Sequence, residues 1–253
     1  MWVQAEFAEV VALRGVVATA VAVAWTAVCA VVGGAEAGSP AVPSFLFFSG
    51  TDIWRYGAFL YGGLLWSPAG LDADGFTFKM LVDGGRYNYV AGAGSFAENI
   101  DGTKLSVAAL PGWRLSRDGL IVTVFAGPVA QDYRLAPADP GSRLNGFYVG
   151  GEFSADIWYQ PNPRTMAALN GAIASIGPTG YLRAAFGIRL LGAAFVGPEI
   201  EQLWCADFQE IEFGGHVTGL RVDALQWSMG GGFALTSDQR SGPYVRLGVN
   251  ARY

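Results

Sequence analysis

Charged residues, cysteine and histidine are all scarce in this chain. Of its 253 residues 15 % are charged, compared with roughly 25 % in an average soluble domain, which indicates that something other than water faces much of the surface. The two cysteines, Cys29 and Cys205, lie on either side of an expected cleavage point, so we expect no intramolecular disulfide and no cysteine-based metal cluster. The net charge is −5 and no basic patch is visible, so we do not expect a nucleic-acid partner.

The N-terminal region has the pattern of a secretory signal peptide over residues 1–37, followed by one domain over residues 38–253. The apolar segment 15–37 ends in Ala35-Glu36-Ala37, which fits an h-region with an A-x-A cleavage site. The residues before it carry two glutamates against one arginine, where a signal peptide is usually positive, so a later translation start is an alternative. A retained anchor is another, because the run approaches the ~20 residues that span a bilayer.

From about residue 44 onward, apolar and polar residues alternate in segments separated by Gly, Pro, Asp and Ser. Successive side chains of a strand point to opposite faces, so each segment has one apolar and one polar face. Bacterial single-chain barrels have an even number of strands, so we predict 10–12, with the first two segments as a candidate single strand. The segments lie at 44–54, 57–67, 75–90, 103–116, 119–133, 143–159, 164–176, 180–190, 192–204, 209–221, 223–236 and 243–253.

Alternation alone also fits a soluble sandwich or a lipocalin-like barrel, so the choice of a membrane barrel depends on other features. The polar faces carry few Lys and Glu residues, and the chain after residue 37 has no apolar run long enough for a helix span. Only helices and closed barrels satisfy every backbone amide in lipid, so we predict an all-β antiparallel transmembrane β-barrel. Aromatic residues that fit interfacial girdles occur near strand ends, at Trp54, Trp66, Trp113, Trp158, Trp204 and Tyr253.

The last segment indicates how this barrel closes. Val245, Leu247, Val249 and Tyr253 share its apolar face, and the alternation continues to the final residue. Chain ends fray unless a sheet holds them, so we expect this strand to pair with the first one. Its terminal aromatic residue also resembles the carboxy-terminal signal of outer-membrane barrel proteins. We therefore expect a location in the outer membrane of a Gram-negative bacterium, in contact with its lipid.

Polar side chains on the inward faces are the candidate site residues. We expect them either to bind a sugar or to satisfy one another, and we expect no catalytic residue, cofactor or metal. Longer loops are expected at 67–74, 91–102, 134–142 and 203–209. Asp72 and Asp74 have a spacing that hints at calcium, but calcium needs six to eight oxygens, so a hydrophilic loop is favoured. The lumenal candidates are Tyr148, Glu152, Asp156, Tyr181, Arg183, Glu210, Glu212, His216 and Thr218.

His216 and Thr218 allow an alternative reading as an enzyme. A histidine two residues before a hydroxyl resembles the H-x-S arrangement of outer-membrane phospholipases and lipid A deacylases, in which the histidine activates a serine. Here the hydroxyl belongs to a threonine, and Glu210 and Glu212 share the same face, so that face is expected to be internal. A lumenal polar residue is the simpler interpretation of His216.

Several segments resemble the BcsS family of cellulose biosynthesis proteins. They are "FFSGTDIWRYGAFLYGGLLWSPAGLDADGFTFKMLVDGGRYNY" (47–89), "FVGPEIE" (195–201), "GGHVTGLR" (214–221) and "SDQRSGPYVRLGV" (237–249). The resemblance implies a role in cellulose or other exopolysaccharide production and implies no catalytic residues. With the barrel pattern, it favours a non-enzymatic outer-membrane accessory protein, with cellulose and other cellulose-synthesis components as candidate partners. The alternatives are a lipid-modifying barrel enzyme and a soluble periplasmic β-barrel binding module.

Overall fold

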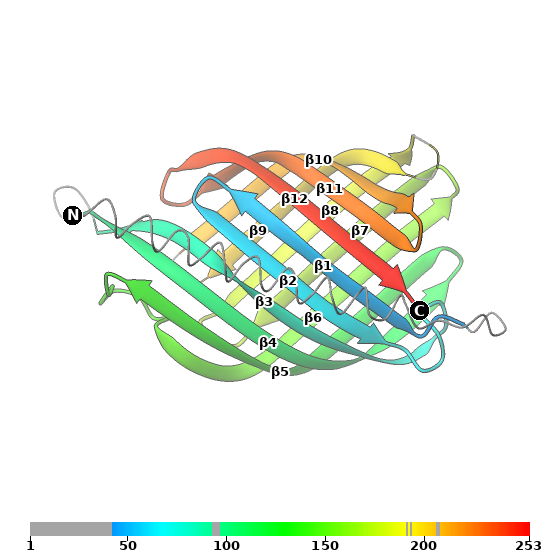
Figure 1. Ribbon diagram of the computed structural model, residues 1–253, viewed down its shortest axis with the longest axis horizontal. Coiled ribbons are helices and arrows are strands. Elements are labelled where there is room, and N and C mark those ends of the chain that lie inside the picture. The colour runs from blue at the N-terminus through cyan, green and yellow to red at the C-terminus, as the bar shows by residue number, and fades with distance from the viewer. Residues whose placement is uncertain (1–41, 93–96, 191, 193, 206–207) are drawn as a thin grey trace. The chain divides into compact units, whose positions relative to one another are not determined.

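The computed structural model describes residues 42–253, except 93–96, 191, 193, 206 and 207. Its strands form one closed antiparallel barrel in which each strand pairs with the next and β1 pairs with β12 (Figure 1). The predicted all-β barrel is confirmed, with the larger of the expected strand numbers. The strands are β1 (Phe45–Trp54), β2 (Gly57–Trp66), β3 (Gly75–Ala91), β4 (Glu98–Arg117), β5 (Leu120–Ala136), β6 (Gly146–Asn162), β7 (Thr165–Ala174), β8 (Thr179–Arg189), β9 (Phe195–Cys205), β10 (Phe208–Val222), β11 (Leu225–Thr236) and β12 (Ser241–Arg252).

The expected signal peptide and its cleavage site lie outside the described residues. Within the described part of the chain, no helix is long and apolar enough to span a membrane. Closure is made by the two ends of the barrel sequence: β1 and β12, blue and red in Figure 1, run side by side. Tyr253 extends this pairing, because its N–H donates to the carbonyl of Phe45 and its own carbonyl accepts from the N–H of Phe45, both at 2.8 Å.

The outer wall of the barrel is apolar. Along each strand the large hydrophobic side chains alternate with residues that face inward, as the period of two requires. Val245 on β12 is 60 % exposed and Leu105 on β4 is 55 % exposed, whereas their sequence neighbours Arg246 and Ser106 are buried. The exposed set extends around the barrel and includes Ile53, Met80, Val107, Trp113, Phe147, Val149, Phe153, Ile173, Leu182, Phe186, Ile200, Phe213, Phe233 and Leu247.

The strand pairing settles one alternative and corrects two expected loops. Arg55 and Tyr56 form a hairpin turn, so the first two segments are separate strands. The expected loop at 91–102 is shorter, because β4 already begins at Glu98. The expected loop at 203–209 is mostly strand. Residues such as Asp101 suggest a loop by type, but Asp101 is paired with Asn88, whose side chain donates to it at 2.8 Å.

The aromatic girdle was predicted correctly only in part. Trp66 and Trp113 are exposed on the outer wall, as an interfacial aromatic residue should be. Trp54 is instead buried, where it packs with Ala234 and Tyr244. The reason is its parity in β1: Ile53 faces outward, so the next residue must face inward.

One side of the lumen is filled by apolar side chains. These come from strands β2, β4 and β5 and from the turns at either end, since Leu71 follows β2 and Leu144 follows β5. Arg114 fixes the first of these turns by donating to the carbonyl of Leu71 and to Thr123. The cluster consists of Leu65, Leu71, Ala108, Leu110, Phe125, Val129, Tyr133, Leu144 and Ile176.

Candidate functional site in the barrel lumen

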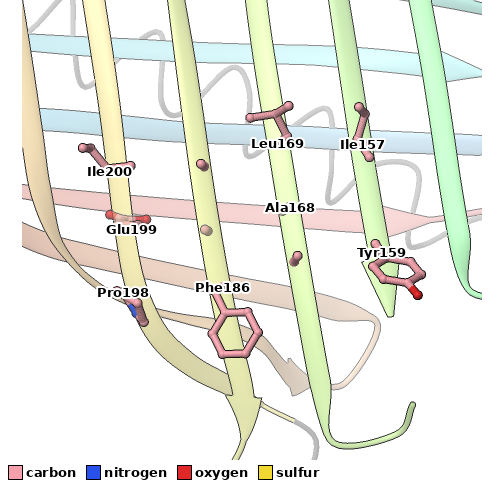
Figure 2. Close-up of a pocket in the computed structure, with 11 residues that line it drawn as sticks. Ile157, Tyr159, Ala168, Leu169, Phe186, Pro198, Glu199 and Ile200 are labelled. Carbon is pink, nitrogen blue, oxygen red and sulfur yellow. The ribbon is translucent and has the colours of Figure 1, made fainter. Parts of the chain in front are cut away.

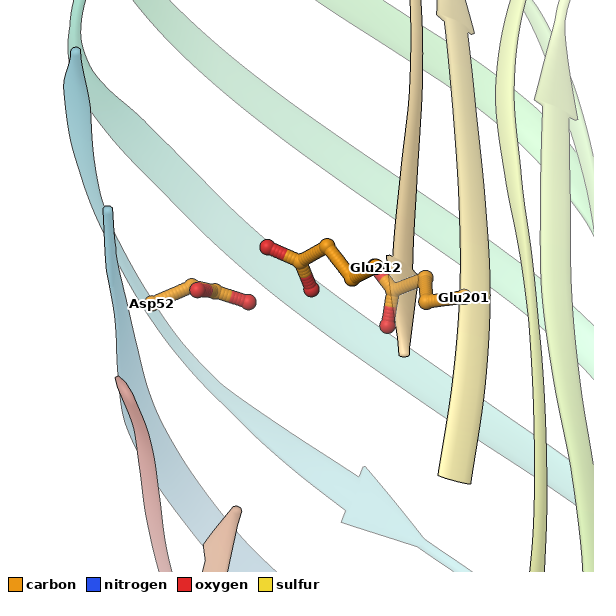
Figure 3. Close-up of side chains that lie close together, drawn as sticks. All are labelled: Asp52, Glu201 and Glu212. Carbon is orange, nitrogen blue, oxygen red and sulfur yellow. The ribbon is translucent and has the colours of Figure 1, made fainter. Parts of the chain in front are cut away.

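Arg246 of β12 is the centre of a charged network on the other side of the lumen. Its Nε donates to Asp52 at 2.8 Å and its Nη2 to Glu212 at 2.7 Å, while its Nη1 lies 2.8 Å from a carboxylate oxygen of Glu201. These carboxylates come from β1, β10 and β9, whose polar faces all turn inward. Figure 3 shows the three carboxylates, with Asp52 lying across from Glu201 and Glu212.

A second arginine extends this network to β8. Arg183 donates through Nε to Glu199 at 3.1 Å and lies 4.0 Å from Glu201. Glu199 also accepts from the hydroxyl of Tyr244 at 2.9 Å. Neighbouring strands therefore share one hydrogen-bonded system, which holds its charged groups in fixed positions.

The network contains more acid than base. Its carboxyl groups are Asp52, Glu199, Glu201 and Glu212, and its guanidinium groups are those of Arg183 and Arg246. Glu210 is buried on the same face of β10 but is not part of the network, and one of its carboxylate oxygens has no hydrogen-bond partner among the residues that the structure describes. One oxygen each of Asp52, Glu201 and Glu212 lie within 4.8 Å of one another, a spacing that would suit a metal ion. However, the guanidinium of Arg246 already contacts all three, so it takes the place that a metal ion would need.

A smaller polar group lies on β3, β6 and β7. Lys79 donates to Ser154 at 3.1 Å and pairs with Asp156 at 3.4 Å, and its ammonium lies 4.1 Å from the centre of the Phe125 ring. Asn170 donates to the other oxygen of Asp156 at 2.9 Å. This pairing stabilises one cation where the charged and apolar sides of the lumen meet.

The remaining polar candidates are spread along the lumen. Glu152 and Tyr181 are half-buried on inward faces of β6 and β8. The hydroxyl of Tyr148 donates to the carbonyl of Asn145 at 3.0 Å and so holds the turn before its own strand. The structure brings Arg183 and Glu212 into the Arg246 network, but it does not gather all the candidates into a single site.

His216 and Thr218 do approach each other. Nδ1 of His216 lies 2.9 Å from the hydroxyl of Thr218, and Nε2 lies 3.0 Å from the carbonyl of Phe186. A carbonyl can only accept, so Nε2 carries the proton and Nδ1 accepts from the threonine. His216 is 2 % exposed and its strand parity directs it to the lumen, not to the outer wall.

The backbone pairing explains why His216 is bonded to Phe186. The β8–β9 ladder is interrupted between Ala185, paired with Glu199, and Ile188, paired with Val196. Pro198 lies in this gap and has no N–H, so the ladder lacks a donor there. His216, from the next strand, supplies a donor to the carbonyl of Phe186.

The outer wall carries a shallow groove of about 400 Å³ above the same interruption (Figure 2). Small residues hollow it, and larger apolar side chains form its rims. Apart from Tyr159 and Glu199 its lining is apolar, so it offers no array of polar groups for a soluble substrate. It is lined by Ile157, Tyr159, Ala167, Ala168, Leu169, Ala184, Ala185, Phe186, Pro198, Glu199 and Ile200.

The two aspartates after β2 each have an arginine partner. Asp72 lies 3.1 Å from Arg252, and Asp74 accepts from the N–H of Ser116 at 2.7 Å and pairs with Arg117. The hydrogen bond from Ser116, followed by that from Arg117, lowers the pKa of the Asp74 carboxyl. These contacts explain the acidic loop without calcium.

Comparison with protein families gives a match over residues 46–253 to the family described as cellulose biosynthesis protein BcsS. The chain belongs to this family. The match covers the barrel from the second residue of β1 to residue 253, so the residues of the Arg246 network all lie within the BcsS region. No curated protein sequence matches the chain.

Solved structures that align with this BcsS protein are bacterial barrels with low sequence identity. The KdgM porin aligns over 82 % of this chain and 99 % of its own length, with a TM-score of 0.43 and 11 % identity. The beta domain of the Bordetella autotransporter Brka aligns over 84 % of this chain and 100 % of its own length, with a TM-score of 0.48 and 13 % identity. LpxR from Salmonella typhimurium aligns over 83 % of this chain and 100 % of its own length, with a TM-score of 0.46 and 9 % identity.

Proposed function

We propose that this BcsS protein is an outer-membrane β-barrel that acts as a non-enzymatic accessory in the synthesis or export of cellulose or a related exopolysaccharide. The observation that carries the membrane location is the apolar outer wall, which extends over all sides of a closed barrel. Exposed apolar surface of this extent is a cost in water and is favourable in lipid, where closed barrels leave no unpaired edge. The family match supports the process.

The packed lumen supports an accessory role rather than an open glucan channel. Barrels with wide aqueous channels have roughly 16–18 strands, whereas this one has the twelve strands β1 to β12. Its interior is filled on one side by the apolar cluster that includes Phe125 and on the other by the Arg246 network. A role in assembly or in binding polysaccharide at the barrel mouth needs no open bore.

Fractionation and gel mobility test the membrane location. We expect the protein in the outer-membrane fraction and expect it to dissolve only with detergent. On a gel, an unboiled sample should migrate faster than a boiled one, because the barrel stays folded unless it is boiled. Recovery in the soluble periplasm without a mobility shift would instead favour a periplasmic binding module. A deletion strain tests the process: cellulose output should fall and should return when the intact gene is supplied.

A lipid hydrolase is the second candidate, and the contact between His216 and Thr218 is the observation that favours it. The tautomer fits a base that accepts the threonine proton. Against it, His216 is buried toward the lumen and its second nitrogen bonds a backbone carbonyl, not a carboxylate. We therefore expect purified protein and its Thr218→Ala variant to release equal, background amounts of fatty acid from outer-membrane lipid. Loss of a measurable release in the variant would favour the enzyme.

A further inference from the structure

Aromatic rings lie flat against the lumenal wall where β2, β3 and β4 meet. Phe59 on β2 is paired with Gly85 on β3, and a Cβ on that glycine would lie 2.6 Å from Cδ1 of the ring. Tyr87 on β3 is paired with Gly102 on β4, where a Cβ would lie 2.8 Å from Cε1 of its ring. Each ring thus covers a glycine on the neighbouring strand and turns one face toward the lumen.

The rings form a row. The planes of Phe59 and Tyr87 are 13° apart with centroids 6.3 Å apart, and those of Tyr87 and Tyr89 are 21° apart with centroids 6.2 Å apart. All three side chains are only half-buried, so a ligand can reach them. We call Phe59, Tyr87 and Tyr89 the aromatic row.

The row leads out of the barrel mouth. β2 begins at Gly57, which is paired with Tyr87, so the rest of β3 pairs only with β4 and projects beyond the β1–β2 hairpin. Figure 1 shows β3 and β4 extending past that hairpin. Phe59 therefore lies inside the mouth and Tyr89 lies on the projecting part.

Polar groups flank the rings. Lys104 is paired with Gly85, the residue beneath Phe59, and its ammonium lies 3.0 Å from Asp83. Both side chains keep 23 % of their surface exposed. The hydroxyl of Tyr89 donates to Asp139 at 2.7 Å. A row of flat rings with charged hydrogen-bonding groups beside it is the surface that a pyranose chain needs, because the sugar C–H faces pack on aromatic faces while the hydroxyls lie at the edges.

We propose that the aromatic row is a binding platform for one chain of β-1,4-linked glucan at the mouth of the barrel. This proposal rests on the proposed function and adds the ligand class. An extended β-1,4-linked chain is a flat ribbon, so its sugar rings can pack on neighbouring aromatic rings whose planes are nearly parallel and whose centroids lie 6.3 Å and 6.2 Å apart. The sugars of an α-1,4-linked glucan have similar C–H faces, but that chain is curved, so we expect fewer of its sugars to pack on the row at the same time.

Calorimetric titration of the detergent-solubilised protein with cellohexaose and with maltohexaose tests this platform. We expect cellohexaose to bind and maltohexaose to bind at least about tenfold more weakly, a ratio that corresponds to about 1.4 kcal/mol. Tyr87→Ala and Tyr89→Ala should each weaken cellohexaose binding by about tenfold, and Tyr87→Phe should retain it, since the ring face is kept. No cellohexaose binding, or equal binding of the two sugars, would overturn the proposal.

A matched control separates ring contact from general stability. Phe125 also lies over a glycine, Gly112, but is 1 % exposed and cannot touch a ligand. Phe125→Ala should lower stability and leave the cellohexaose affinity within twofold, with folding of every variant checked by gel mobility. If Phe125→Ala and Tyr87→Ala weaken binding equally, the row is not the platform. Fractionation and the deletion phenotype do not depend on cellohexaose, so a failure here leaves the proposed function to be judged on its own.

Discussion

The two sides of this lumen are packed by different physical means. On the side of β8 to β12 and β1, Arg246 and Arg183 bind carboxylates in one hydrogen-bonded system. On the side of β2 to β5, apolar and aromatic side chains pack on glycines and on one another. A buried charge depends on its partners, and loss of one partner leaves the others unpaired, whereas an apolar core depends on volume and shape. The two sides should therefore respond differently to single substitutions.

The largest expected effect is that of Arg246→Met. This change leaves Asp52, Glu201 and Glu212 close together without their shared cation. Breaking a buried ion pair in this way costs about 3–5 kcal/mol. We expect a loss of this size in the free energy of unfolding, measured by urea titration of the protein folded in detergent micelles.

Arg252→Met is the control for that experiment. Arg252 also pairs with an aspartate, Asp72, but both side chains are largely exposed. Exposed pairs contribute about 0–1 kcal/mol, so this variant should stay close to the wild type. Equal losses for Arg246→Met and Arg252→Met would contradict the view that the network stabilises through buried charge.

On the apolar side of the lumen, Gly102→Ala tests whether stability depends on the close fit of a ring against a glycine. The added Cβ would lie 2.8 Å from Cε1 of Tyr87, so the ring must move off the wall. Overpacking of this kind costs about 1–3 kcal/mol. Gly151→Ala is the matched control, because its nearest atom is a backbone oxygen at 4.0 Å. Both are measured by urea unfolding, and a Gly102→Ala variant as stable as Gly151→Ala would mean that the ring does not lie on the glycine.

The sequence predicted the strands far better than it predicted the contents of the lumen. Alternation repeats along each strand and depends only on near neighbours, so the closed sheet and the outward faces could be read from it. Arg246 was visible as a polar residue of the last strand, but its partners Asp52 and Glu201 lie 194 and 45 positions away. Finding them requires the register between strands, which one sequence does not specify.

The aromatic row was missed for a related reason. A glycine within a strand pattern indicates only a bend or the close approach of another group, and only the cross-strand pairing shows that a ring covers Gly85 and Gly102. Trp54 was assigned to the girdle because it lies at a strand end, but position along a strand does not decide which face a side chain takes. The alternation could have shown this, because Trp54 directly follows Ile53 and must therefore point to the opposite face.

His216 lies on the charged side of the lumen, but its second ring nitrogen bonds to the backbone and not to a carboxylate. It therefore tests whether that side is also stabilised by means other than buried ion pairs. His216→Ala removes the donor to the Phe186 carbonyl, and an unsatisfied buried acceptor costs about 1–3 kcal/mol. Adding Pro198→Ala supplies an N–H at the ladder interruption, so His216→Ala should cost less in that background. The free energies of unfolding of the two single variants and the double variant check this coupling. Strict additivity would show that the histidine does not replace the missing proline donor.

The smallest expected effect is at the turn between β11 and β12, outside the lumen. Burial raises the pKa of Asp238, but the hydrogen bond from Thr236 and the charge of Arg240 outweigh it and hold that pKa below its ordinary value of 3.8. Because the folded state has the lower pKa, the ionised aspartate stabilises the fold above about pH 4, and this contribution disappears as the pH falls through the lowered pKa. Asp238→Asn should therefore cost about 1 kcal/mol or less at neutral pH.

The pH profile distinguishes this turn from the lumenal network. The difference in unfolding free energy between wild type and Asp238→Asn should shrink steadily as the pH is lowered below 4, with the two curves meeting at the acid end. A difference that stays constant down to that end would mean that Asp238 contributes through hydrogen-bond geometry alone and not through its charge. The turn would then resemble the apolar side of the lumen, where shape decides stability, more than the Arg246 side.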